Sequence, residues 1–160
     1  MNTLMMPELS LSTKKITILL VEDNPADRRL THEVFKDTAI CNEVYTVNDG
    51  EAAMDYLFKR GEFTSAPKPN LVLLDLNLPK KNGLEVLSEM KGNISLRSIP
   101  VIVLTTSKAD EDIARSYDLH ANAFISKPVN LDDFIQVIES LKQFWLSAVA
   151  LPPVIRDGDL

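Results

Sequence analysis

Four apolar stretches of this sequence end in polar residues whose types could share one site. Glu22-Asp23 follow Val21, Asp75 follows Leu74, Thr105 follows Leu104, and Lys127 follows Ser126. If the four stretches are parallel strands of one sheet, their carboxyl ends lie along one edge, where open α/β sheets bind ligands. Three carboxylates, a hydroxyl and an ammonium would then meet in one pocket.

The three carboxylates, Glu22, Asp23 and Asp75, predict a divalent cation at this edge. Like charges a few ångströms apart raise one another's pKa, and a bound cation relieves the repulsion. Carboxylate oxygens, completed by a carbonyl and waters, suit Mg²⁺, which also binds phosphate oxygens. No Cys or His lies near these positions in the sequence, which argues against zinc or copper.

Asp75 is the best candidate for a nucleophile, because it follows the apolar stretch that we expect in the middle of the sheet. A carboxylate beside Mg²⁺ can accept a phosphoryl group as an aspartyl phosphate. Catalysis of that transfer is mostly positioning and charge stabilisation. The metal, the Lys127 ammonium and the Thr105 hydroxyl could each take one phosphoryl oxygen. A cis Lys127-Pro128 bond, which proline permits at modest cost, would help to aim Lys127 inward.

The elements that must position these residues alternate between strand and helix. Strands are predicted at about 16–21, 44–47, 71–74, 101–104 and 123–126. Helical spacing of apolar residues predicts helices at about 25–37, 50–60, 82–92, 109–119 and 131–146. The third and fourth strands are almost wholly apolar, as strands buried on both faces must be. Right-handed crossovers then predict an α/β fold, a five-stranded parallel sheet with helices on both faces.

Composition narrows the class of protein. The 160 residues suit one domain, and 45% hydrophobic with 25% charged residues is typical of a globular protein. A net charge of −6 and the lack of a basic stripe argue against nucleic-acid binding. Signal-peptide features and apolar runs of membrane-spanning length are missing. We therefore expect a cytoplasmic protein with a flexible tail at 1–14, one domain at 15–146 and a C-terminal extension at 147–160.

At the motifs above, the sequence resembles the receiver domain of two-component response regulators. The likeness covers about residues 15–146. The matching segments follow the order of that family: Leu20–Asn24, Leu74–Pro79, Asn82-Gly83, Leu104-Thr105 and Lys127-Pro128. The resemblance implies a doubly wound, flavodoxin-like sheet with the strand order 2-1-3-4-5.

The resemblance also implies a reaction. A phosphoryl group would pass from a histidine kinase or a phosphotransfer protein to Asp75. Glu22 and Asp23 would hold Mg²⁺ with Asp75, and Asn77 would add its backbone carbonyl. Thr105 and Lys127 would contact the phosphoryl group. Beyond slow autodephosphorylation, no turnover of an external substrate is expected.

Two further segments narrow the resemblance. Residues 56–61 and 116–122 look like those of the small regulators paired with bacterial, especially cyanobacterial, phytochrome kinases. Red or far-red light would then be the upstream signal. The position three before Lys127, often tyrosine in the family, is Phe124. A switch that involves Thr105 and Phe124 would therefore work by packing, without a tyrosine hydroxyl.

With no second domain expected, the output should be binding. Phosphorylation would shift a two-state equilibrium, and the face of residues 109–119, 123–126 and 131–146 would change most and dock an unknown downstream protein. The last helix is apolar on more than one side. Phe144 and Trp145 add apolar surface beyond what one buried stripe of the helix needs. Such a surface favours a symmetric homodimer through this face and the C-terminal extension. A single thick core face is the alternative.

Two other functions are weighed against this one. An aspartate-nucleophile phosphatase of small phosphate esters would need an acid two residues after Asp75, and Asn77 cannot donate that proton. A phosphorylation-independent dimeric adaptor would not need an intact acidic site. The remaining reactive side chains are expected to have ordinary surface or loop roles: His32, His120 and Cys41.

Overall fold

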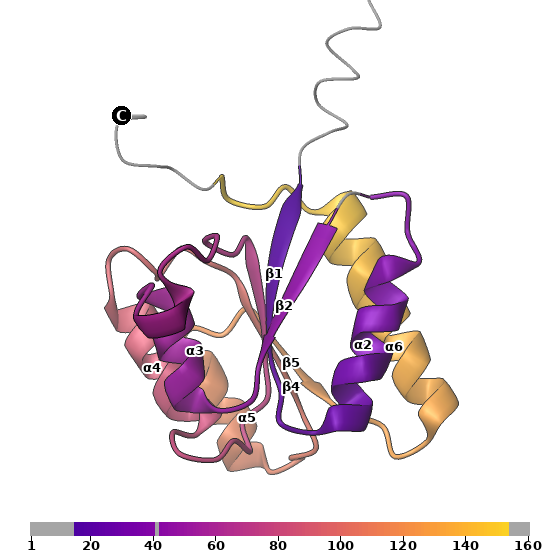
Figure 1. Cartoon of the computed structure of the whole chain (residues 1–160). Coiled ribbons are helices and arrows are strands. Elements are labelled where there is room, and N and C mark those ends of the chain that lie inside the picture. Colours follow the sequence, from indigo (N-terminus) through magenta and orange to yellow (C-terminus); the bar gives the residue numbers. More distant parts are fainter. Residues whose placement is uncertain (1–14, 41, 154–160) are drawn as a thin grey trace, which may run out of the picture.

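The computed structural model of this chain, which describes residues 15–40 and 42–153, has one parallel sheet at its centre (Figure 1). Its five strands lie in the order β2-β1-β3-β4-β5, so the predicted fold class and strand order are confirmed. The strands are β1 (Ile16–Val21), β2 (Asn42–Val47), β3 (Leu71–Leu74), β4 (Val101–Thr105) and β5 (Ala123–Ser126).

Helices cover both faces of the sheet. Helices α2 and α6 lie on one side, and α3, α4 and α5 lie on the other (Figure 1). Each face buries its own apolar core, one built around Leu19, Val72 and Val103 and the other around Ile18, Leu73 and Ile102. The helices are α2 (Pro25–Lys36), α3 (Gly50–Leu57), α4 (Gly83–Gly92), α5 (Asp110–Asp118) and α6 (Leu131–Gln143).

The central strands are buried along their whole length, because helices cover them on both faces. All residues of β3 and β4 are buried, which matches a sequence that is apolar throughout except for Thr105 at the end of β4. Edge strands β2 and β5 are mostly half-buried. The carboxyl end of β3 therefore places Asp75 at the middle of the sheet edge.

Side-chain caps fix where the helices near this edge begin. Asn24 caps α2 by accepting a hydrogen bond from the backbone N–H of Asp27, at 3.0 Å. Asn82 and Glu85 form a reciprocal capping box at the start of α4. Gly83 lies against the backbone of Asp75, where a Cβ atom would come within 2.3 Å of the Asp75 carbonyl oxygen. These contacts hold the loops after β1 and β3 close to the sheet edge.

Two predicted helix ends and one predicted isomer need correction. The second predicted helix ends at Leu57 rather than near residue 60, and a short 3₁₀ turn, η2 (Gly61–Phe63), follows it. The last helix ends at Gln143 and continues as one π turn, η3 (Phe144–Ala148). The Lys127-Pro128 bond is trans, because no described peptide bond is cis. The backbone N–H of Lys127 donates instead to the Thr105 carbonyl at 2.6 Å, which orients Lys127 without a cis bond.

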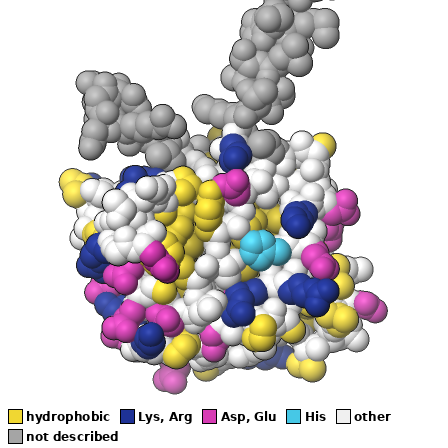
Figure 2. Space-filling model, viewed as in Figure 1, with side chains coloured by type: hydrophobic (Ala, Val, Ile, Leu, Met, Phe, Trp, Pro, Cys, Tyr) yellow, Lys and Arg dark blue, Asp and Glu magenta, His cyan; other side chains and the backbone are white. Residues whose placement is uncertain are grey.

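The predicted tail 1–14 and Cys41 lie outside the described residues, as do residues 154–160 of the predicted extension. Within the described residues, no helix combines the length and the hydropathy that crossing a membrane would require. On the face seen in Figure 2, Lys and Arg side chains are interspersed with Asp and Glu.

Candidate phosphoryl-transfer site

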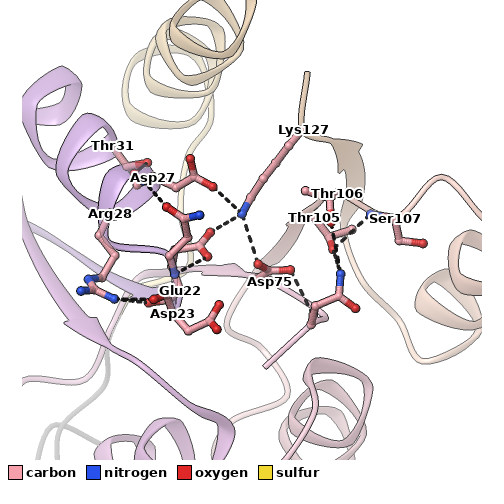
Figure 3. Close-up of polar contacts among 12 residues, drawn as sticks. Glu22, Asp23, Asp27, Arg28, Thr31, Asp75, Thr105, Thr106, Ser107 and Lys127 are labelled. Atoms are coloured by element: carbon pink, nitrogen blue, oxygen red, sulfur yellow. Dashed lines mark hydrogen bonds and ion pairs between the residues drawn. The ribbon is translucent and has the colours of Figure 1, made fainter. Parts of the chain in front are cut away.

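Three carboxylates meet at the carboxyl edge of the sheet, as predicted. Glu22 and Asp23 come from the loop after β1, and Asp75 follows β3 (Figure 3). Each offers an oxygen that lies within 4.8 Å of the others. Glu22 and Asp75 are buried, whereas Asp23 is exposed, so one side of the cluster opens to solvent. An all-oxygen cluster that keeps room for water fits a hard divalent cation such as Mg²⁺.

Lys127 lies at the centre of this group. It follows β5, which is separated by β4 from the strand that leads to Asp75. Its ammonium Nζ lies 2.5 Å from Glu22 Oε1 and 3.1 Å from Asp75 Oδ2. A third carboxylate, Asp27 of α2, lies 3.0 Å from the same Nζ atom. An ammonium has three N–H donors, so these contacts use all of them (Figure 3).

Burial and charge shift the pKa values of this group. Burial raises the pKa of Glu22 to about 7, and the Asp75 charge adds to the shift, although the hydrogen bond and charge of Lys127 oppose it. Burial alone would lower the pKa of Lys127. The hydrogen bond and charge of Glu22, with Asp75 and Asp27, outweigh burial and raise that pKa above its ordinary value. Lys127 therefore stays an ammonium.

Carboxylates still outnumber the ammonium. Lys127 faces Glu22, Asp27 and Asp75, and Asp23 adds a fourth carboxylate to the cluster. The surplus of negative charge favours binding of a cation.

Hydroxyl and amide groups border the other side of Asp75. Thr105 is fully buried at the end of β4, and its Oγ1 accepts from Asn77 Nδ2 at 3.4 Å. The same amide donates to Thr106 Oγ1 at 3.3 Å. The backbone N–H of Asn77 donates to Asp75 Oδ1 at 3.1 Å. The structure thus brings together the predicted phosphoacceptor Asp75, the predicted phosphoryl contacts Thr105 and Lys127, and Asn77, which was predicted to be a metal ligand through its backbone carbonyl.

Two site residues, Asp27 and Arg28, were missed in the sequence analysis. Arg28 Nη1 donates to the backbone carbonyls of Glu22 at 3.2 Å and Asp23 at 2.9 Å, which fixes the loop that carries both carboxylates. A signal for both was present, since they stand in the first turn of a helix capped by Asn24. An acidic residue in a first turn, such as Asp27, is also favoured by the helix dipole alone, so its position does not separate a role in the site from a role in the helix.

Of the two predicted switch residues, Thr105 lies at the site, whereas Phe124 and the predicted interface residues Phe144 and Trp145 lie away from the cluster. Phe124, on β5, is half-buried, and its backbone N–H donates to the Tyr117 hydroxyl at 3.1 Å. Phe144 is 56% exposed and packs edge-on against Trp145, with ring centroids 5.7 Å apart. Both aromatic rings border an apolar groove of about 690 Å³ between β5 and α6. No described contact tests the predicted switch or the predicted dimer.

The two histidines differ in their surroundings. His120 is exposed just after α5, as expected of an ordinary surface residue. His32 is half-buried, and its Nε2 lies 2.6 Å from Thr46 Oγ1 of β2. Burial lowers the pKa of His32, and the charges of Lys36 and Arg28 lower it further.

Known proteins resemble this chain closely. Response regulator Rcp1 of Synechocystis sp. is 50% identical over 135 residues, which cover 84% of this chain and 92% of Rcp1. The crystal structure of the Mn²⁺-bound form of Rcp1 superposes with a TM-score of 0.85 at 49% identity, covering 86% of this chain and 99% of that one.

The crystal structure of the phosphorylated cyanobacterial phytochrome response regulator RcpA also gives a TM-score of 0.85. Its identity is 48%, and the match covers 88% of this chain and 100% of RcpA. The family model described as "Response regulator receiver domain" matches residues 18–139. With its sheet order, its carboxylate cluster and these matches in agreement, the chain belongs to the response regulator receiver family.

Proposed function

We propose that this receiver domain accepts a phosphoryl group on Asp75 from a histidine kinase or a phosphotransfer protein. The observation that carries the proposal is the position of the Lys127 ammonium, 3.1 Å from Asp75 Oδ2 beside a cluster of three carboxylates. The Asp75 carboxylate, which would accept the phosphoryl group, therefore lies beside the Lys127 ammonium and beside carboxylates that could bind a metal cation.

Mg²⁺ fits the carboxylate cluster, where Glu22, Asp23, Asp75 and the backbone carbonyl of Asn77 would hold it. When bound, it would neutralise charge on the carboxylates and on the incoming phosphoryl oxygens. An oxygen of Asp75 attacks phosphorus while the bond from phosphorus to the donor's leaving atom breaks. Lys127 donates to one phosphoryl oxygen, and the buried Thr105 hydroxyl donates to another. These charge-assisted contacts supply the stabilisation that phosphoryl transfer needs.

A phytochrome-type kinase is the donor that we infer for this chain. The support is its 48% identity to RcpA, which is a cyanobacterial phytochrome response regulator, and its 50% identity to Rcp1. Red or far-red light would then control phosphorylation of Asp75.

The output that we infer is binding, not turnover. An aspartate-nucleophile phosphatase needs a proton donor two residues after its nucleophile, and the Asn77 amide cannot fill that role. Phosphorylation would instead draw Thr105 towards the phosphoryl group and change the packing of Phe124 on the neighbouring strand. The face of α5, β5 and α6 would then bind a downstream protein, and it would also form a homodimer through the groove that Phe144 and Trp145 border.

Incubation with acetyl phosphate and Mg²⁺, followed by intact mass measurement, tests the phosphoacceptor. The wild-type protein should gain one phosphoryl group, and D75N should gain none because an amide cannot attack phosphorus. D118N is the matched control, since Asp118 is an exposed carboxylate at the end of α5, and it should be phosphorylated like the wild type. Uptake by D75N, or steady release of phosphate from many esters, would overturn the proposal.

A further inference from the structure

Lys127 has one partner that the carboxylate cluster does not explain. Glu22 and Asp75 belong to the group whose oxygens lie within 4.8 Å of one another, and Asp27 does not. Its Oδ2 nevertheless lies 3.0 Å from Lys127 Nζ. Residues 27 and 127 come from opposite ends of the chain, α2 and the end of β5, so this ion pair ties the two together.

The local structure of α2 leaves the Asp27 carboxylate free for this contact. Asp27 is the third residue of the helix, from which an acidic side chain commonly reaches back to the backbone N–H of the capping residue. Here the N–H of Asn24 donates to Glu22 Oε2, at 3.1 Å, instead. The first helical turn therefore does not use the Asp27 carboxylate as a cap.

The backbone of Asp27 is fixed on both sides. Its N–H donates to Asn24 Oδ1 at 3.0 Å, and its carbonyl accepts from Thr31 Oγ1 at 2.8 Å. Thr31 is itself buried, with 2% of its surface exposed. The Asp27 carboxylate thus has a rigid support, as a group that positions another side chain requires.

The three partners of Lys127 would have different fates during phosphorylation. Glu22 would share its charge with a bound cation, and Asp75 would carry the phosphoryl group. Asp27 is the partner whose contact with Lys127 need not change. We propose that Asp27 is a positioning residue, which holds the Lys127 ammonium over Asp75 and so sets the rate of phosphoryl transfer. The inference rests on the proposed function and adds a residue to it.

The chain provides a matched control in α6. Asp133 stands at the same third position after a capping asparagine, Asn130, whose side chain accepts from the Asp133 N–H at 3.2 Å. Asp133 is exposed and makes none of the ion pairs found for Lys127. D133A therefore removes the same helix-end charge without touching the proposed anchor.

The test compares wild type, D27A, D27N and D133A. Phosphorylation rates are measured at saturating acetyl phosphate, and Mg²⁺ affinity is measured separately by calorimetry on the unphosphorylated proteins. D27A should phosphorylate about tenfold more slowly, the size of effect expected for a lost hydrogen bond between charged groups. D27N keeps an acceptor oxygen for Lys127 and should fall between D27A and wild type. D133A should equal wild type. Mg²⁺ affinity should fall by a smaller factor than the phosphorylation rate in D27A and D27N, since Asp27 adds charge near the cluster without belonging to it.

Several outcomes would overturn the inference. D27A could match D133A, or it could phosphorylate faster than wild type, which would make Asp27 a competitor for Lys127. A loss of Mg²⁺ affinity as large as the loss of rate would make Asp27 part of the metal site. If D27A does not fold, the phosphorylation rates of D27N and D133A are compared instead, and a D27N rate equal to that of D133A would overturn the inference. A wild-type protein that takes up no phosphoryl group would overturn the proposed function, and this inference with it.

Discussion

Lys127 shows how one residue can serve both the stability and the chemistry of this site. Its ammonium is buried, with 5% of the residue surface exposed, and it balances charge that would otherwise be too costly to bury. Its contacts with Glu22, Asp27 and Asp75 come from three different elements. The same ammonium would meet a phosphoryl oxygen after transfer. Stability in the unphosphorylated state and reactivity therefore depend on one group.

Replacement of Lys127 by glutamine should make stability depend strongly on a divalent cation. In EDTA at neutral pH, K127Q should lose about 3 kcal/mol of unfolding free energy, because the buried carboxylates lose their counter-ion. Added Mg²⁺ should stabilise K127Q more than wild type, since it supplies the missing positive charge. Urea denaturation with and without Mg²⁺ measures both effects. K80Q is the control, because Lys80 is largely exposed and 3.7 Å from Asp49. Equal gains from Mg²⁺ in K127Q and wild type would contradict the expectation.

We expect His32, at the contact between α2 and β2, to make the folding stability depend weakly on pH. Burial, Lys36 and Arg28 lower its folded-state pKa below the ordinary value of 6.5. The unfolded chain therefore binds this proton more readily, so the contribution to stability is full above about pH 6.5 and is lost as the pH falls. On going from pH 7.5 to pH 5.5, the melting temperature of H32Q should fall less than that of wild type. The two decreases should differ by no more than about 2 °C. Identical pH profiles for the two proteins would show that His32 does not contribute.

At the scale of elements, close backbone contact holds the start of α4 against the end of β3. A Cβ atom on Gly83 would lie 2.3 Å from the Asp75 carbonyl oxygen and 2.6 Å from Leu76 Cα. Both are backbone atoms, which cannot rotate away as a flexible side chain could. The glycine therefore allows α4 to begin directly beside the strand end that carries Asp75.

Two glycines at opposite ends of α4 give a matched pair of substitutions. G83A should cost about 3 kcal/mol or more, because the backbones of α4 and β3 must separate to relieve the overlap. G92A should be neutral or stabilise by up to about 1 kcal/mol, since nothing lies within 4 Å of the added Cβ. Chemical denaturation of both variants measures the difference. A cost for G83A no larger than that for G92A would mean that the two elements are not in such close contact.

The elements could be predicted from the sequence because their signals are local. Apolar runs without interruption located β3 and β4, and Asn82-Gly83 located the start of α4. Helix ends were less accurate, as at Gln143, where the apolar pattern continues through Phe144–Ala148 but the backbone changes to a π turn. Apolar spacing reports which side of a segment is buried, and it does not distinguish one helical pitch from another.

The site could be predicted only in part, because some of its contacts depend on tertiary structure. The motifs identified Glu22, Asp23, Asp75, Thr105 and Lys127 before the sheet was known. The role of Asp27 required knowing that Lys127 reaches α2. Lys142 is a similar case, since this buried lysine donates to the backbone carbonyls of Val34 at 3.2 Å and Asp37 at 2.9 Å. Nothing in the sequence distinguishes Lys142 from the other polar residues of the last helix.

At the scale of the whole molecule, the proposed site and the proposed binding face share β4 and β5. Thr105 ends β4, and Phe124 pairs with Val103 of the same strand across the parallel ladder. A shift of Thr105 towards a phosphoryl group would therefore act on the strand pair that carries Phe124. Helix α5 follows the end of β4 and helix α6 follows the end of β5, so the path from site to face is short.

The proposed homodimer gives the prediction that belongs to this scale. Phe144 is 56% exposed beside an apolar groove between β5 and α6, and a charge placed there would be buried without a partner in a dimer. In sedimentation velocity at micromolar concentrations, wild type should sediment as a dimer and F144D as a monomer. F58D is the control, because Phe58 is also exposed, at 40%, but lies at the end of α3 on the other face of the sheet; it should remain dimeric. A monomeric wild type would contradict the dimer, and a dimeric F144D would place the interface elsewhere. Because the groove adjoins the strand that carries Phe124, the same run on phosphorylated protein would show whether the state of Asp75 reaches this interface.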